Sequence, residues 1–211
     1  MLDTLSDKNK QVLNLFRAAA VVTDRLFWQQ TFGDKALMEN LGDQAAADYA
    51  MINYGPWDRL DDNSPFVKGY GEKPAGANYY PQDITKAEFD SFDDPAKNSP
   101  YTVLRRDGDG NLKCVWYHDE YREPLERICR YLEEAAMITE NEGLRNYLQK
   151  RVQAFRTDEY YESDLAWMDM KDSNIDIVIG PIENYDDKLN EIKTSYECFI
   201  LLKDIERSAE L

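Results

Sequence analysis

Histidine is almost absent from this chain, in which His118 stands alone among 211 residues. A zincin-type hydrolase holds its metal with two histidines one helical turn apart, and a neighbouring glutamate activates the water. The residues around His118 read YHDEY and supply no second histidine. We therefore expect neither a metal ligand nor a catalytic residue in this chain, and we interpret His118 as a surface or helix-start residue.

Cysteine is also scarce, and its placement excludes two classes of small domain. Cys114, Cys129 and Cys198 are odd in number, lie far apart and form no CxxC pair. A disulfide framework uses an even set of cysteines, and a zinc ribbon uses paired CxxC motifs. The chain also lacks the GxGxxG and GxxxxGK[ST] phosphate loops and the GxSxG nucleophile motif. We expect no cofactor to be bound by this chain.

Basic residues are too few for a partner that carries many phosphates. The chain has 25 Lys and Arg against 41 Asp and Glu, for a formal net charge of −16. Affinity for nucleic acids comes largely from Lys and Arg, and anionic lipid surfaces attract polybasic segments. We therefore expect neither a nucleic-acid partner nor an anionic-membrane partner for this acidic protein.

Long apolar runs are missing as well. No stretch of about 18 apolar residues occurs, so we expect no membrane span. The first residues, MLDTLSDKNK, are polar and lack the apolar segment of a signal peptide. We predict a cytoplasmic protein, and a periplasmic or lipid-anchored one only if a leader has been trimmed.

What the chain does contain is enough apolar side chain for a packed core, with 43% hydrophobic residues. Apolar residues recur at three- and four-residue steps over two long regions, a spacing typical of amphipathic helices. We predict mainly helical structure over residues 1–52 and 119–170, with Ser6 as the first N-cap and an interruption at Gly42. A short helix should follow the capping residue Thr85.

The helical pattern fails between residues 53 and 81, where prolines and glycines are interspersed with aromatic residues. Irregular segments of this length are uncommon unless they are functional or wrap over a partner. We favour a packed loop whose aromatic side chains insert between the helices, and a binding surface is the alternative. The aromatic anchors are Tyr54, Trp57, Phe66, Tyr79 and Tyr80.

Two β-prone runs flank the sequence DGDGN and predict a hairpin over about residues 101–117, because Asp-Gly and Asn supply the positive φ angles of a tight turn. This acidic turn lacks the Gly and Glu positions of an EF-hand calcium loop, so we interpret it as a turn alone. Further strands are expected over about residues 175–202, which are rich in β-branched and aromatic residues. A helix should begin at Lys203.

The predicted fold class is α+β, predominantly helical, with a small antiparallel sheet formed by the hairpin and the C-terminal strands. We interpret residues 1–211 as a single lobe. In this lobe, residues 171–202 form a β-containing wall of a cleft.

The segment WMDMKDSNIDIVIGPIENY resembles part of the dipeptidyl peptidase III family, which are zinc-dependent exopeptidases. That family has a tryptophan, a lysine four residues later, an acidic residue, an Ile-Gly pair, and then Ile-Glu and a tyrosine. The matching residues here are Trp167, Lys171, Asp176, Ile179, Gly180, Ile182, Glu183 and Tyr185.

The resemblance implies roles for several of these residues. The family's acidic residue before Ile-Gly helps to bind the free amino terminus of the substrate, and Asp176 occupies that position. Better-known members place a peptide-contacting tyrosine directly before Ile-Gly, where this chain has Val178. We take Asp176, Val178, Gly180 and Glu183 as candidate substrate-binding residues. Glu183 could orient Lys193 or an arginine, or cap the turn, and we favour this structural role.

The resemblance also implies an activity that this chain does not complete by itself. We expect an N-terminal, non-catalytic lobe of a zinc metallopeptidase that removes dipeptides from short peptides. The zinc and the catalytic base would lie in a catalytic lobe later in the same chain. The alternative is a stand-alone, non-catalytic module that binds peptides or proteins.

Overall fold

The computed structural model describes residues 5–171, 173–204 and 207. The chain divides into two compact units, which share three elements: helix α1 (Asp7–Thr31) and strands β5 (Ile175–Glu183) and β6 (Ser195–Leu202). Unit 1 contains the described residues up to Asp24, residues Tyr117–Gly180, and those from Tyr196 onward. Unit 2 contains Arg25–Trp116 and Pro181–Ser195. The single-lobe organisation expected from the sequence stays a prediction.

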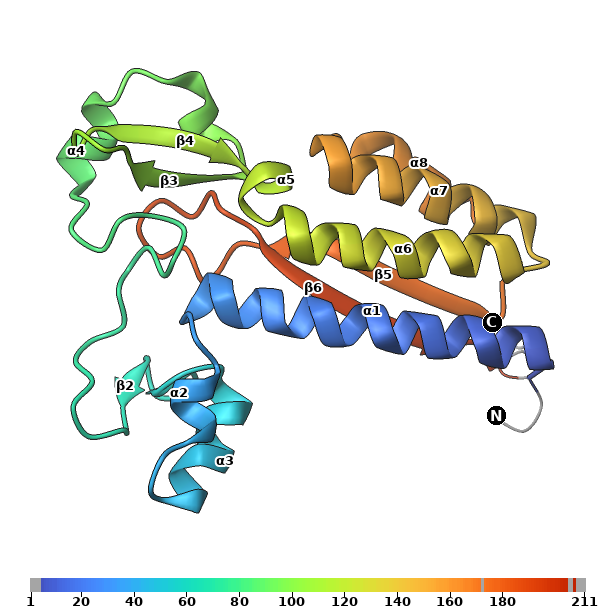
Figure 1. Cartoon of the computed structure of the whole chain (residues 1–211), viewed down its shortest axis with the longest axis horizontal. Coiled ribbons are helices and arrows are strands. Elements are labelled where there is room, and N and C mark those ends of the chain that lie inside the picture. The colour runs from blue at the N-terminus through green and yellow to red at the C-terminus, as the bar shows by residue number, and fades with distance from the viewer. Residues whose placement is uncertain (1–4, 172, 205–206, 208–211) are drawn as a thin grey trace. The chain divides into compact units, whose positions relative to one another are not determined.

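Unit 1 is built on packed helices (Figure 1): α5 (Tyr117–Glu120), α6 (Arg122–Ile138), α7 (Glu142–Thr157) and α8 (Tyr161–Asp169), beside the first part of α1. Helices α6 and α7 pack together, as do α7 and α8. Their contact faces carry the periodic apolar residues, of which Leu125, Ile128, Leu132, Leu148 and Phe155 are completely or almost completely buried. Asn141 caps α7 by accepting a hydrogen bond from the Leu144 N–H at 2.8 Å.

The sheet of unit 1 consists of β5 paired with β6. Ile175, Ile177 and Ile179 alternate along β5 as its buried side chains. Tyr196 of β6 is completely buried, and its ring centroid lies 6.0 Å from that of Phe155 on α7. One face of this sheet therefore belongs to the core of unit 1.

Unit 2 contains α2 (Ala36–Glu39), α3 (Gln44–Asn53), α4 (Lys86–Ser91), the 3-10 helix η2 (Pro95–Asn98) and two short sheets. Strand β1 (Trp57–Asp58) pairs with β2 (Ser64–Pro65), and β3 (Thr102–Arg106) pairs with β4 (Leu112–Trp116), both antiparallel. A hydrophobic cluster of Trp28, Met38, Ala50 and Val67 forms part of the core of this unit.

The predicted fold class is confirmed, because helices predominate and the expected hairpin and C-terminal strands are present. These strands form separate two-stranded sheets rather than one continuous sheet. The Ser6 side chain accepts a hydrogen bond from the Asn9 N–H, and Thr85 accepts one from the Glu88 N–H, as their predicted capping roles require. The helix expected from Lys203 falls largely outside the described residues.

The aromatic side chains of the segment from residue 53 to residue 81 are packed into the protein rather than exposed to solvent. Trp57, Tyr79 and Tyr80 are buried, while Tyr54 and Phe66 are partly buried against the hydrophobic cluster. The segment also contains the β1–β2 ribbon, which the sequence did not predict. The aromatic residues therefore act as anchors, as the packed-loop interpretation expected.

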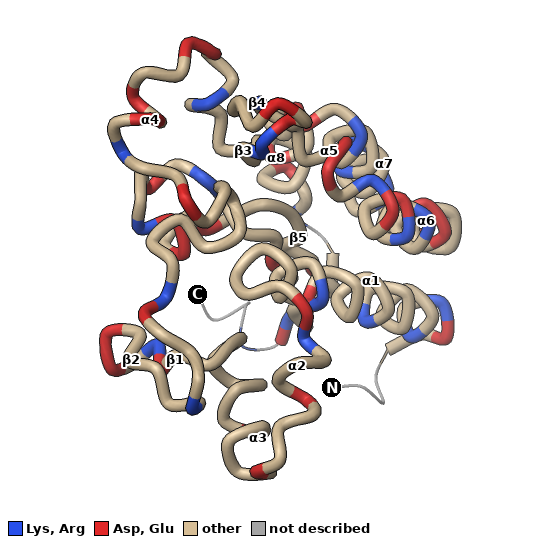
Figure 2. Tube along the Cα trace, turned by 60° about the vertical axis from the view of Figure 1, so that its left-hand side comes forward, with Lys and Arg blue, Asp and Glu red and all other residues tan. Residues whose placement is uncertain are grey.

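The distribution of acidic residues and the hydropathy of the helices agree with the expectations from the composition. Acidic residues occur on many helices and loops of both units (Figure 2), so the negative charge is not confined to one element. Among the residues that the structure describes, no helix has the length and apolarity that crossing a bilayer requires.

Candidate functional site

Three of the four candidate substrate-binding residues lie on the part of β5 that belongs to unit 1. Asp176 and Val178 alternate with the buried isoleucines and are partly exposed. The alternation then stops, because Ile179 and Gly180 are both buried. Glu183 is exposed at the end of β5, in unit 2. Asp176 and Val178 thus share a partly exposed face of the strand, whereas Gly180 is buried.

The Asp176 carboxylate is held by one hydrogen bond. Its Oδ1 atom accepts from the indole Nε1 of Trp167 on α8 at 2.9 Å. The second oxygen, Oδ2, forms no hydrogen bond or ion pair within the described part of the chain. An indole is a neutral donor, so it orients the carboxylate without cancelling its charge. Two residues of the family motif are therefore hydrogen-bonded to each other, and Trp167 orients the carboxylate of Asp176.

Gly180 lies against a buried arginine that the sequence did not single out. The Arg151 side chain extends from α7, and its guanidinium carbon lies 5.3 Å from the ring centroid of Tyr147 and 5.3 Å from that of Tyr160. Its Nη2 atom donates to Asp164 at 2.5 Å. The guanidinium thus lies directly against β5 at Gly180.

The proposed contact between Glu183 and Lys193 is replaced by a different arrangement in unit 2. The Lys193 ammonium donates to the carbonyl oxygens of Lys97 and Ser99 and to the hydroxyl of Thr102, at 2.7, 2.8 and 2.8 Å. An ammonium has three donors, so these acceptors satisfy it completely. Burial lowers the pKa of Lys193 to about 8. Lys193 therefore has a structural role, and its ammonium is bonded to these three acceptors rather than to Glu183.

Two buried carboxylates after β5 fasten the long segment of residues 53–81 within unit 2. Asp186 accepts from Arg59 at 2.9 and 3.1 Å and from Lys73 at 2.6 Å. Asp187 accepts from the Tyr80 hydroxyl at 2.7 Å. Adjacent aspartates in a connecting loop give no sequence signal of burial, because such residues are normally solvated.

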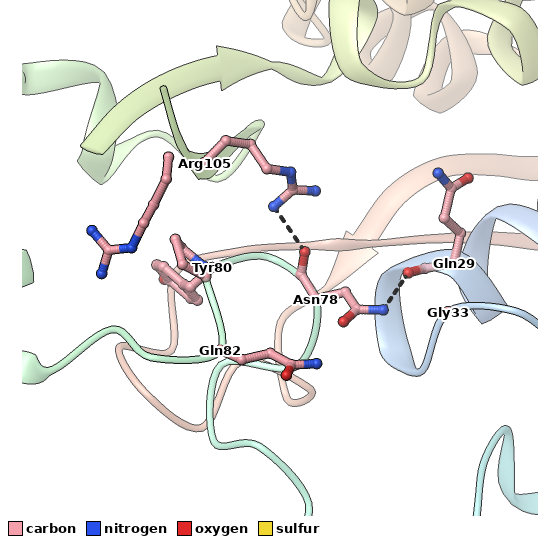
Figure 3. A pocket seen from close by; sticks show the side chains of 8 residues that line it. Gln29, Gly33, Asn78, Tyr80, Gln82 and Arg105 are labelled. Carbon is pink, nitrogen blue, oxygen red and sulfur yellow. Dashed lines mark hydrogen bonds between the residues drawn. The ribbon is translucent and has the colours of Figure 1, made fainter. Parts of the chain in front are cut away.

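A polar pocket of about 410 Å³ lies in unit 2 near the end of α1 (Figure 3). Asn78 is one of its lining residues, and its Nδ2 atom donates to the Gln29 carbonyl at 2.9 Å while its N–H donates to the Gln30 carbonyl at 2.9 Å. Arg105 donates in turn to the Asn78 carbonyl at 3.0 Å. These bonds satisfy carbonyls that every helix C-terminus leaves unpaired. The pocket residues connect α1 to β3 and have a structural role.

The donors in the described part of the chain do not form a site for the zinc that the resemblance implies. His118 bonds through Nδ1 to the buried carboxylate of Asp158 at 2.7 Å, and its Nε2 atom faces Asp119 at 3.5 Å. The described residues contain no group of three or more His, Cys, Asp or Glu side chains placed to hold a metal ion. Structural and catalytic zinc sites use at least three protein ligands. A zinc ion would therefore need ligands beyond those that the described residues provide.

Comparisons with known proteins point to the same family as the motif that runs from Trp167 to Tyr185. The profile of peptidase family M49 matches residues 96–211. Dipeptidyl peptidase III from Caldithrix abyssi is 39% identical, with a TM-score of 0.92 over 98% of this chain. The enzyme from Corallococcus sp. strain EGB is 31% identical, with a TM-score of 0.92 over 100% of this chain. Nudix hydrolase 3 of Arabidopsis thaliana is 30% identical over an alignment of 273 residues that covers this whole chain.

In each case this chain spans only part of the relative. It covers 42% of each dipeptidyl peptidase III structure and 35% of the plant protein. The family profile matches more than half of the chain, and the region around Asp176 lies within that match. The chain therefore belongs to peptidase family M49.

Proposed function

We propose that this chain is the N-terminal lobe of a zinc-dependent, dipeptidyl peptidase III-like exopeptidase, and that it binds the amino terminus of short peptides. Zinc and the general base would be supplied by a catalytic lobe outside the 211 residues. The chain itself would bind and orient the substrate. Family membership supports the peptidase assignment, and the geometry of β5 supports the binding role.

The observation that carries the proposal is the Asp176 carboxylate, which is oriented through one oxygen and open at the other. A protonated amino terminus that leaves water needs a carboxylate partner, because an unpaired ammonium in a cleft is strongly disfavoured. Asp176 is partly exposed, so it stays hydrated without a ligand and pairs when an ammonium arrives. Its Oδ2 atom is the acceptor for the substrate's N–H groups.

The other candidate residues then have different roles. Val178 shares the partly exposed face of β5 with Asp176 and offers an apolar contact in place of the tyrosine of better-known relatives. Gly180 and Arg151 fix the path of the strand. Glu183, exposed at the end of β5, contributes negative charge that attracts peptide amino termini over a longer range.

The proposal is tested with the peptide Leu-Ala-Ala-Ala and its N-acetyl form, which lacks the ammonium. Calorimetric titration should give binding of the free peptide, and the acetylated peptide should bind at least tenfold more weakly, which corresponds to about 1.4 kcal/mol. Asp176→Asn should remove this difference by weakening the free peptide alone. Asp169→Asn, an exposed carboxylate at the end of α8, is the matched control and should change neither affinity.

Equal affinity of the two peptides for the unmodified chain would contradict the proposal. So would an Asp176→Asn variant that still prefers the free amine. Circular dichroism of each variant confirms that any loss of binding does not arise from unfolding.

A further inference from the structure

The polar pocket near the end of α1 has a lining that differs in charge from the rest of this acidic chain. The pocket measures about 410 Å³, and none of the eight described residues that line it is an aspartate or a glutamate. Two of the eight are arginines, Arg105 and Arg106. Over the whole chain, acidic residues outnumber basic ones by 41 to 25. The balance in the lining is therefore the reverse of the balance in the chain.

The polar groups around this pocket are mainly hydrogen-bond donors. Side-chain amides come from Gln29 of α1 and from Asn78 and Gln82 in the segment between β2 and α4, and a guanidinium comes from Arg105 of β3 (Figure 3). Gln29 and Gln82 are exposed, and a side-chain amide can turn its NH2 group toward a ligand. A ligand in the pocket would therefore meet N–H groups from three parts of unit 2.

The two arginines of the lining contribute differently. The guanidinium of Arg106 is bonded to the carboxylates of Asp83 and Glu88, which lie outside the lining, so its charge is balanced there. The Nη1 atom of Arg105 donates to two backbone carbonyl oxygens, at 3.0 Å in each case. Carbonyl groups carry no net charge, so these two bonds fix the Arg105 side chain at the pocket without cancelling its charge.

The backbone at the pocket adopts a conformation that residues with a side chain rarely adopt. Ala77, directly before Asn78, is buried and has a φ angle of +43°. Strained residues of this kind cluster at binding and active sites, where the surrounding structure holds them in place. Here the strain accompanies the two bonds from Asn78 to the carbonyls of Gln29 and Gln30, which fix one wall of the pocket.

We propose that the pocket around Arg105 binds a small oxyanion, either a phosphate or a carboxylate. A guanidinium pairs with both groups through the same fork of N–H donors, and the amides of Gln29 and Gln82 add further bonds. A cation would meet no carboxylate in the described lining, and an apolar ligand would leave the amides without partners. The inference does not depend on the proposed peptide site. By linking α1 to β3, the bound anion stabilises unit 2 in proportion to its concentration.

The test uses inorganic phosphate and succinate as probes of the whole chain. Calorimetric titration measures the binding of each, with sodium chloride at matched ionic strength as the reference. At least one probe should bind, and the one that binds more tightly identifies the kind of oxyanion. Gln29→Glu and Gln82→Glu each place a carboxylate in the lining and should weaken this binding by about tenfold or more. Gln153→Glu, which adds the same charge at an exposed position of α7, is the matched control and should leave the affinity unchanged.

Two results would overturn the site. One is that neither phosphate nor succinate binds above the chloride reference at millimolar concentration. The other is that the glutamate variants at positions 29 and 82 bind as tightly as the unmodified chain, or lose no more affinity than Gln153→Glu, since the response would then follow net charge alone. Both positions are exposed, so the substitutions should leave the fold intact, and circular dichroism of each variant verifies this.

Discussion

The guanidinium Nη1 atom of Arg151 lies 3.0 Å from the position that a Cβ atom on Gly180 would occupy. Gly180 also has a φ angle of +150°, which side chains rarely adopt. The arginine cannot easily retreat, because it is stacked between two tyrosine rings and paired with Asp164. The glycine of the family's Ile-Gly pair is thus explained by a contact with α7.

Gly180→Ala should destabilise the chain by about 1–3 kcal/mol, since it adds backbone strain and displaces a buried guanidinium. Urea unfolding followed by circular dichroism gives this difference. Gly71→Ala is the control, because a Cβ atom there meets nothing within 4 Å. An equal effect of the two substitutions would show that Arg151 does not restrict position 180.

Asp186→Asn should destabilise the chain by about 3 kcal/mol at neutral pH, because it leaves two cations beside a buried neutral amide. Burial alone would raise the pKa of Asp186, but the charges of Lys73 and Arg59 outweigh it and lower the pKa below 3.8. A carboxyl with a depressed pKa stabilises the fold above its unfolded value and loses this effect as pH falls.

The difference in unfolding free energy between the unmodified chain and Asp186→Asn should therefore shrink between pH 4 and pH 2, the window below about 3.8. Unfolding in urea at a series of pH values measures it. Asp93→Asn, which changes an exposed carboxylate in unit 2, is measured alongside as the control. A difference that stays constant down to pH 2 would show that Asp186 is not an ionised partner of Arg59 and Lys73.

Comparison of the unmodified chain with Lys193→Met shows how the titration of the buried Lys193 ammonium contributes to the pH dependence of stability. Burial lowers the pKa of Lys193 from 10.5 to about 8, so between these values the unfolded chain binds more protons than the folded one. Stability from this group therefore rises with pH over that window, by roughly 3 kcal/mol in total. The methionine variant lacks the gain and also leaves three acceptors unpaired.

The stability advantage of the unmodified chain over Lys193→Met should thus grow from pH 7.5 to pH 10.5. The comparison between variants cancels the contributions of Tyr147, Cys129 and Cys198, whose pKa values burial raises. An advantage that stays flat or declines over this range would contradict a lowered pKa for Lys193.

The purified 211-residue chain should release no dipeptide from dipeptidyl-arylamide substrates, with or without added zinc. The physical reason is that its described donors include no set of three that could hold the metal. A fluorescence assay of arylamine release checks this. Turnover that is lost with Asp176→Asn would show that the chain carries its own catalytic machinery.

The helices and the hairpin could be predicted because their signals are local. Ser6 and Thr85 cap helices through residues three positions away, and the carboxylate of Asp107 folds the hairpin turn by accepting from the N–H groups of Asp109 and Asn111. Asp176 was found through a motif of contiguous residues. Such features require no knowledge of distant contacts.

The buried charges could not be predicted in the same way. Arg59 and Asp186 lie 127 positions apart, and Lys193 lies more than 90 positions from each of its three acceptors. Charged residues are rarely buried unless they are paired, so sequence alone favours a solvated position for each of them. The polar pocket around Arg105 was missed for a related reason, because its lining residues come from separate stretches of the chain.

The most direct test of the central claim uses the indole N–H of Trp167 as a reporter of Asp176. The chain has four tryptophans, and comparison with Trp167→Phe assigns the relevant signal in a proton–nitrogen correlation spectrum. Titration with Leu-Ala-Ala-Ala should move this signal to saturation, because the ammonium binds the carboxylate that the indole holds. The N-acetyl peptide should leave it in place. No movement with the free peptide, or equal movement with both peptides, would show that Asp176 does not recognise the amino terminus.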